Sequence, residues 1–192
     1  MKSNETANQW EIVIRFTFLS LLVLGFLYPL AITGLAFTFF PLKANGSLFL
    51  SEGKVVGSEL LAQGTVSKSI FRYRPSAVSY ATIPSGASNL GPSSLELKNL
   101  VEERKLELET LGISIEECLE LVYTSASGLD PHISVPCAYE QAKFLQKERK
   151  IPLDQINELI LKHIEHPLFG FMGRERVNVN KLNRDWKEIT HE

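Results

Sequence analysis

The chain has 192 residues, with 20 Lys and Arg against 22 Asp and Glu and a formal net charge of −2. This balance offers no excess of basic side chains to neutralise a run of phosphates, which excludes a nucleic acid as the expected partner. Once an N-terminal apolar stretch is set aside, the remaining length suits one compact domain.

The N-terminal region predicts one transmembrane helix. Residues 16–42 contain no charged side chain, and about 25 apolar residues would span about 37 Å as a helix, against a hydrocarbon core of about 30 Å. A cleaved signal peptide is the alternative, but its apolar core is shorter, and no Ala-x-Ala-like site follows Phe40. We therefore expect an N-terminal flank at 1–15, a transmembrane helix at 16–42 and a soluble domain at 43–192.

The predicted membrane helix carries a proline and a row of small residues. The ring of Pro29 crowds the carbonyl group of Gly25, so we expect a local kink there. Ala31, Gly34 and Thr38 follow at helical spacing and form a narrow face that allows close approach of another membrane helix, although such rows also arise by chance. We favour packing of this face, together with Gly25 and Pro29, against a partner helix.

The charges on either side of the membrane helix do not orient it. Lys2 and Arg15 precede the span, and Lys43 and Lys54 follow it. The positive-inside rule therefore gives a tie, and the side on which the soluble domain lies stays open on charge alone.

Two cysteines, Cys118 and Cys137, lie in the soluble part. They form no metal-type CxxC pair, so they are either buried thiols or, if the domain faces an oxidising compartment, a disulfide. We favour buried thiols, because the sequence spacing carries no evidence for the geometry that a bridge requires.

The soluble part begins with two strands and a long loop. Residues 48–50 and 55–56 are short apolar runs on either side of a Ser-Glu-Gly turn and predict a β-hairpin. Residues 62–92 are rich in Ser, Ala, Gly, Pro and Tyr without clear periodicity. A loop of that length in a compact domain is more often functional than idle.

Helical signals dominate the rest of the chain. Ser93 and Glu96 form a capping box before an amphipathic helix that Gly112 ends. A second capping box, at 114–117, precedes a short helix or turn, and residues 119–123 predict a buried strand.

The C-terminal part predicts two helices, at 134–150 and 152–166, and a short strand at 176–179. The expected fold class is therefore an α+β soluble domain that follows one N-terminal transmembrane helix. The chain contains no internal repeat.

The familiar catalytic patterns are absent. Ser127, Asp130 and His132 are neighbours in sequence, but a hydrolytic triad combines distant segments, and no G-x-S-x-G motif occurs, so a turn explains these residues better. His163 and His166 share a helix face, as zinc ligands can, without a third ligand at convincing spacing. No Walker-type phosphate loop occurs either. We expect no catalytic residues and no metal site.

A series of short motifs follows in order along the chain. They include Tyr-Pro-Leu at 28–30, Ala-Asn-Gly-Ser at 44–47, Arg-Pro-Ser-Ala at 74–77, Ser-Gly-Ala-Ser-Asn-Leu-Gly-Pro-Ser at 85–93, Ser-Ala-Ser-Gly-Leu-Asp-Pro-His-Ile at 125–133 and Val-Asn-Val at 177–179. In this order, after a single membrane helix, they make the chain resemble the C subunit of the Kdp-type high-affinity potassium-transporting P-type ATPase. The chain departs from that family at Arg72 and Tyr73, where His-Gly is usual, and at Ala87, where a second Gly is usual.

The resemblance implies a non-catalytic accessory subunit in the cytoplasmic (inner) membrane of a bacterium. Its partners would be a channel-like potassium-translocating subunit and an ATP-hydrolysing P-type subunit, with membrane lipid around the helix. The chain lacks the Asp-Lys-Thr-Gly phosphorylation motif, which agrees with hydrolysis on the partner.

Members of this family are described as catalytic chaperones that raise the ATP affinity of the pump subunit. The nucleotide contacts that the resemblance implies fall on Ser127, Gly128 and Gln141. A hydroxyl and backbone N–H groups would meet a phosphate, and the amide would meet a ribose or base. No cofactor is expected on the chain alone, and ATP would be shared with the ATPase subunit. The alternative is a helix-entry turn and a surface glutamine.

The family is also described with its soluble domain outside the cytoplasm, over the potassium entrance, where ATP is not met. That description favours an extracytoplasmic domain and a second interpretation, a structural cap without nucleotide contact. The loop at 62–92 contains no Asp or Glu, so it does not support an acidic funnel for potassium.

Overall fold

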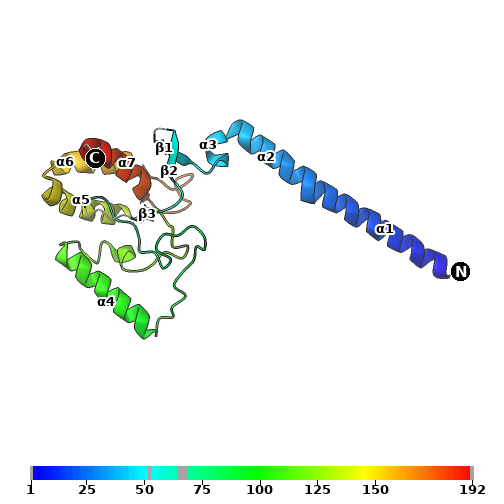
Figure 1. Ribbon diagram of the computed structural model, residues 1–192, viewed down its shortest axis with the longest axis horizontal. Helices are drawn as coiled ribbons and strands as arrows, with labels where there is room; N and C mark the ends of the chain where they lie inside the picture. Colours follow the sequence, from blue (N-terminus) through cyan, green and yellow to red (C-terminus); the bar gives the residue numbers. More distant parts are fainter. Residues whose placement is uncertain (1, 52, 65–68, 191–192) are drawn as a thin grey trace. The chain divides into compact units, whose positions relative to one another are not determined.

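The computed structural model describes residues 2–51, 53–64 and 69–190. The chain divides into two compact units, Met1–Leu48 and Phe49–Glu192, and each is described by itself. Figure 1 shows the first as a long helical rod and the second as a group of helices with short strands.

The first unit is helical almost throughout. Its segments are α1 (Lys2–Leu22), the π-helical turn η1 (Val23–Leu27), α2 (Tyr28–Phe39) and α3 (Pro41–Ala44). The part from Gln9 to Phe39 is long and apolar enough to cross a membrane. The boundaries of the membrane span at residues 16 and 42 stay predictions.

The π-helical turn lies directly before Pro29. Its wider turn accommodates a residue that lacks an N–H group and whose ring crowds the carbonyl group of Gly25. The sequence predicts a local kink at Pro29, and the structure has a π-helical turn that ends two residues before it. Gly25 and Gly34 have open space where a side chain would begin, and the hydroxyl of Thr38 donates to the carbonyl oxygen of Gly34 at 2.7 Å. Packing of this face against a partner helix stays a prediction.

The second unit is the predicted α+β domain. In chain order it contains β1 (Leu48–Ser51), β2 (Lys54–Ser58), α4 (Leu95–Thr110), the 3-10 helix η2 (Leu119–Leu121), β3 (His132–Ile133), α5 (Val135–Arg149), α6 (Leu153–Lys162), β4 (Ile164–Glu165), β5 (Arg176–Asn178) and α7 (Val179–Thr190). β1 and β2 pair as the predicted hairpin. β3, β5 and β4 form a three-stranded sheet with β5 in the centre.

Val177 on β5 marks the middle of the core. It pairs antiparallel with Ile133 of β3 and Ile164 of β4, and it is fully buried. Other fully buried side chains come from the loop before α4 and from three helices; they include Phe71, Leu145, Ile160 and Trp186. The rings of Phe71 and Trp186 meet edge to face with 5.8 Å between their centroids. The loop before α4 is therefore part of the core.

Several local predictions need correction. The predicted strand at 119–123 is the 3-10 helix η2, and the N-cap of α4 is Ser94, whose hydroxyl accepts from the N–H of Leu97, rather than Ser93. Helix α7 was not predicted. Its buried Val179, Leu182 and Trp186 recur at helical spacing, so the signal was present but was masked by the β-branched start of the segment.

The expectation of free thiols is wrong, because Cys118 and Cys137 form a disulfide with 4.6 Å between their Cα atoms. The bond joins the residue just before η2 to the first turn of α5. Both cysteines are fully buried, as expected. Their proximity results from tertiary packing, which the sequence spacing does not express.

Candidate functional site

Amide side chains from two helices hold the extended segment at 69–74. Asn183 of α7 accepts from the N–H of Phe71 at 2.9 Å and donates to its carbonyl oxygen at 2.8 Å. Gln141 of α5 accepts from the N–H of Arg72 at 2.7 Å and donates to its carbonyl oxygen at 3.3 Å. The indole N–H of Trp186 donates to the carbonyl oxygen of Ser69. Each amide side chain thus replaces the strand partner that this buried backbone lacks.

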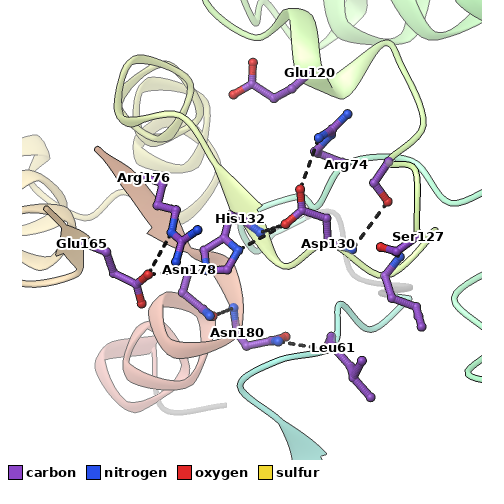
Figure 2. Close-up of polar contacts among 12 residues, drawn as sticks. Leu61, Arg74, Glu120, Ser127, Asp130, His132, Glu165, Arg176, Asn178 and Asn180 are labelled. Atoms are coloured by element: carbon purple, nitrogen blue, oxygen red, sulfur yellow. Dashed lines mark hydrogen bonds and ion pairs between the residues drawn. The ribbon is translucent and has the colours of Figure 1, made fainter. Parts of the chain in front are cut away.

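The first turn of α7 ties down a second segment. Asn178 accepts from the N–H of Asn180 and donates to the carbonyl oxygen of Glu59 at 2.8 Å. Asn180 donates to the carbonyl oxygens of Ser58 and Leu61, and accepts from the hydroxyl of Tyr73 at 2.7 Å. Figure 2 shows Asn178, Asn180 and Leu61 in this arrangement. Sequence reasoning missed these asparagines, although three of them recur within α7 and its approach.

Gln141, a predicted nucleotide contact, lies in the core with 1% of its surface exposed. Both polar atoms of its side chain bind Arg72. The side chain therefore binds the backbone of Arg72, and the alternative interpretation as a surface glutamine is wrong. A nucleotide contact of Gln141 stays a prediction.

Ser127 and Gly128 form a tight turn whose N–H groups are used internally. The N–H of Gly128 donates to the carbonyl oxygen of Ser125 at 3.2 Å. The N–H of Leu129 donates to the hydroxyl of Ser127 at 3.1 Å, and the carbonyl oxygen of Ser127 accepts from the N–H of Gly86. The backbone groups of this turn that bind Ser125, Ser127 and Gly86 therefore have partners within the domain.

Gly128 is required by this packing. Its φ of +71° favours glycine, and a Cβ there would lie 2.8 Å from both the carbonyl oxygen of Gly86 and a methyl group of Val78. Gly112 has a similar φ of +67° but open space around it.

We expect Gly128→Ala to lower the free energy of unfolding by more than Gly112→Ala, which should cost about 1 kcal/mol for backbone strain alone. Urea unfolding of the full-length chain in detergent measures both. Equal losses for the two variants would show that the turn can yield to a side chain.

An open depression with a volume of about 560 Å³ lies beside this turn. Its lining includes Ser127, Ser125, Arg74, Asp130 and Leu61. Of the three residues implied as nucleotide contacts, only Ser127 lines this depression.

A chain of charged groups runs from this depression to the sheet, as Figure 2 shows. Arg74 pairs with Asp130 at 3.2 Å, and Asp130 accepts from the N–H and the Nδ1 of His132 at 3.0 and 3.1 Å. The Nε2 of His132 lies 3.4 Å from Glu165. Because the contacts of His132 are carboxylates and the hydroxyl of Ser127 binds Leu129, these residues form a structural network and not a hydrolytic triad.

The network continues through Glu165. Its carboxylate contacts Arg176 at 3.1 Å and Lys181 at 3.2 Å, and Lys181 also reaches Glu59 at 3.2 Å. Partial burial opposes ionisation of Glu165, but hydrogen bonds from Lys181 and Arg176 outweigh it and lower the pKa of Glu165. Burial likewise opposes ionisation of Asp130, yet the hydrogen bonds and charge of His132, with Arg74, lower its pKa.

Acid should therefore lower the free energy of unfolding of the soluble unit. The native pKa values of Asp130 and Glu165 lie below their ordinary values of 3.8 and 4.5. The stabilisation is complete above those ordinary values and is lost as the pH falls through the lower native ones.

We expect the urea midpoint to fall as the pH drops below about 4.5 and Asp130→Asn to reduce that dependence. The exposed Glu158 on α6 supplies the control, since Glu158→Gln should leave the pH profile unchanged. An Asp130→Asn profile that coincides with that of the unmodified chain would contradict this account.

The two histidines considered as zinc ligands have separate partners. His163 pairs with Asp185 of α7 at 2.9 Å, and His166 pairs with Glu175 at 2.9 Å. Within the described ranges, no group of three His, Cys, Asp or Glu side chains is placed to hold a metal ion.

These features define a class of protein: a single-pass membrane protein with one N-terminal apolar helix and an α+β unit rich in internal polar clamps. A family model described as K⁺-transporting ATPase, c chain (KdpC), matches residues 11–188. The chain therefore belongs to the KdpC family.

Individual relatives agree. The potassium-transporting ATPase KdpC subunit of Methanosphaerula palustris is 44% identical over 165 residues, which cover 85% of this chain and 88% of the relative. The subunit of the same name from Bacillus cytotoxicus is 36% identical over 187 residues, covering 96% and 97%. That of Polaromonas naphthalenivorans is 42% identical over 176 residues, covering 89% of each chain.

Proposed function

We propose that the chain is a non-catalytic accessory subunit of an ATP-driven high-affinity potassium uptake complex. Its soluble unit lies outside the cytoplasm and stabilises the complex. It acts as a catalytic chaperone by raising the ATP affinity of the hydrolytic subunit through contacts between subunits, without touching ATP itself. The partners are a channel-like potassium-translocating subunit and the ATP-hydrolysing P-type subunit.

The disulfide carries the extracytoplasmic part of this proposal. Bonds such as that between Cys118 and Cys137 form and persist in oxidising compartments and are rare in the cytosol. ATP is a cytosolic compound, so an oxidising location separates the soluble unit from it.

The geometry of the implied contacts supports an indirect effect on ATP. Gln141 is buried and bound to Arg72, and the N–H groups of Gly128 and Leu129 donate to Ser125 and Ser127 within the turn. A domain that braces its partners can still favour the nucleotide-bound state of a distant subunit, because the coupling needs only a different affinity for the two states.

Labelling on intact cells tests the location. The native cysteines are bonded and buried, so Ser51→Cys, at an exposed position, supplies one reactive thiol for a membrane-impermeant reagent. Labelling from outside is the expected result. Labelling only after lysis would place the unit in the cytoplasm and restore direct nucleotide contact as the leading mechanism.

Kinetics of the assembled complex test the indirect effect. Ser127 is exposed, so Ser127→Ala should leave the fold intact and the KM for ATP unchanged. Omission of the whole chain should raise that KM. A rise in KM caused by Ser127→Ala alone would contradict the proposal.

A further inference from the structure

The loop that connects β4 to β5 presents four large apolar side chains to solvent. This apolar loop comprises residues 167–173. Phe169 is 79% exposed and Phe171 is 77% exposed. Leu168 and Met172 are 63% and 55% exposed. A soluble surface rarely gathers side chains of this size without something to cover them.

The apolar loop is an ordered turn. Leu168 and Met172 exchange backbone hydrogen bonds at 3.2 and 3.0 Å, and the N–H of Gly170 donates to the carbonyl oxygen of Pro167. Phe169 has a φ of +54°, which a side chain rarely adopts. The rings of Phe169 and Phe171 stack with 6.5 Å between their centroids. The turn thus holds its apolar side chains outward instead of letting them collapse onto the core.

The base of the apolar loop is tied to the hairpin with which the soluble unit begins. Lys181 bridges Glu165, just before the loop, and Glu59, just after β2, at 3.2 Å each. The hairpin is itself apolar on its surface, with Leu50 68% and Val55 59% exposed. Apolar side chains are therefore exposed both on this hairpin and on the loop whose base is tied to it.

The membrane is always within reach of this unit. Residues 40–47 connect the end of α2 at Phe39 to the start of β1 at Leu48, and even fully extended they would reach only about 30 Å. A bilayer held so close presents itself at high effective concentration, so a small apolar contact suffices for binding.

The charges around the apolar loop suit a lipid surface. Arg174 directly follows the loop and makes no ion pair within the described part of the chain, so it is available to a lipid phosphate. Glu165 is paired with Arg176, and the carboxylate of Glu175 lies 2.9 Å from Nδ1 of His166. The cationic side chains directly after the loop are thus Arg174 and Arg176.

We propose that the apolar loop inserts into the lipid surface of the bilayer that holds the chain's own anchor. Phe169 and Phe171 enter the boundary between headgroups and acyl chains, and Arg174 binds a headgroup phosphate. The loop acts as a second membrane contact, which limits the orientations of the soluble unit. This inference rests on the membrane anchor and not on the proposed subunit function.

Fluorescence of the full-length chain in lipid vesicles tests the insertion. Phe171→Trp is introduced with Trp10→Phe, and the buried Trp186 is kept as an internal report of folding. The matched control is Leu106→Trp on α4, at a position 55% exposed. Both are reconstituted alone in phosphatidylcholine vesicles with or without bromine on the acyl chains.

We expect the emission of the tryptophan at position 171 to be blue-shifted and to be mostly quenched in brominated lipid. The emission of the tryptophan at position 106 should show neither change. Water-like, unquenched emission at both positions would overturn the proposal. Equal quenching at both would overturn it too, because the unit would then lie on lipid without selection. A blue shift at 171 that requires the other ATPase subunits would replace lipid by a protein partner.

Discussion

Replacement of Gln141 by Ala is expected to lower the free energy of unfolding of the soluble unit by about 2–4 kcal/mol. The variant leaves the N–H and carbonyl groups of Arg72 without their partner in a partly buried segment. It also opens space in the core, since Gln141 is 1% exposed. Urea unfolding of the full-length chain in detergent, followed by the fluorescence of Trp186, measures this loss.

Gln146→Ala is the matched control, because Gln146 lies on the same helix and is only half-buried. We expect a change within about 0.5 kcal/mol. In the assembled complex, the folded fraction of Gln141→Ala should keep the normal KM for ATP. A variant of normal stability with a raised KM would instead identify Gln141 as a nucleotide contact.

Loss of the disulfide should have a comparable effect. The bond closes a loop between cysteines 19 residues apart, and a loop of that size restricts the unfolded chain by about 3 kcal/mol. The double variant Cys118→Ala, Cys137→Ala should therefore unfold at a lower urea concentration than the oxidised chain. The same unfolding assay checks it.

Reduction supplies the control for this prediction. A reducing agent should destabilise the unmodified chain to a similar extent and should leave the double variant unchanged. If the unmodified chain unfolds at the same urea concentration with and without reducing agent, the prediction that the bond stabilises the unit is wrong.

Three asparagines, one at the end of β5 and two in α7, bind backbone groups of distant segments. Asn178, Asn180 and Asn183 each bind backbone groups of segments more than a hundred residues earlier in the chain. They connect the end of the hairpin, the long loop and the final helix into one body. The loop at 62–92, expected to be functional for its length, is therefore partly a structural strap.

Local patterns were sufficient for the elements whose stability depends on near neighbours. The apolar run of the anchor, the hairpin with strands near 48–50 and 55–56, and the helix that begins at residue 134 were all predicted from the sequence. Each rests on contacts within a few residues, such as the hydroxyl of Ser134 and the N–H of Cys137. The order of short motifs was also sufficient to recognise the KdpC family.

Only the tertiary structure decided the roles of individual polar residues. Gln141 could be read as a surface or ligand-binding amide until its partner, Arg72, 69 residues earlier, was in view. The 3-10 helix η2 and the disulfide next to it depend on packing against α5. A residue's own type and spacing determine local conformation, whereas burial and long-range partners arise when distant segments meet, and a pattern along the chain does not record which segments do.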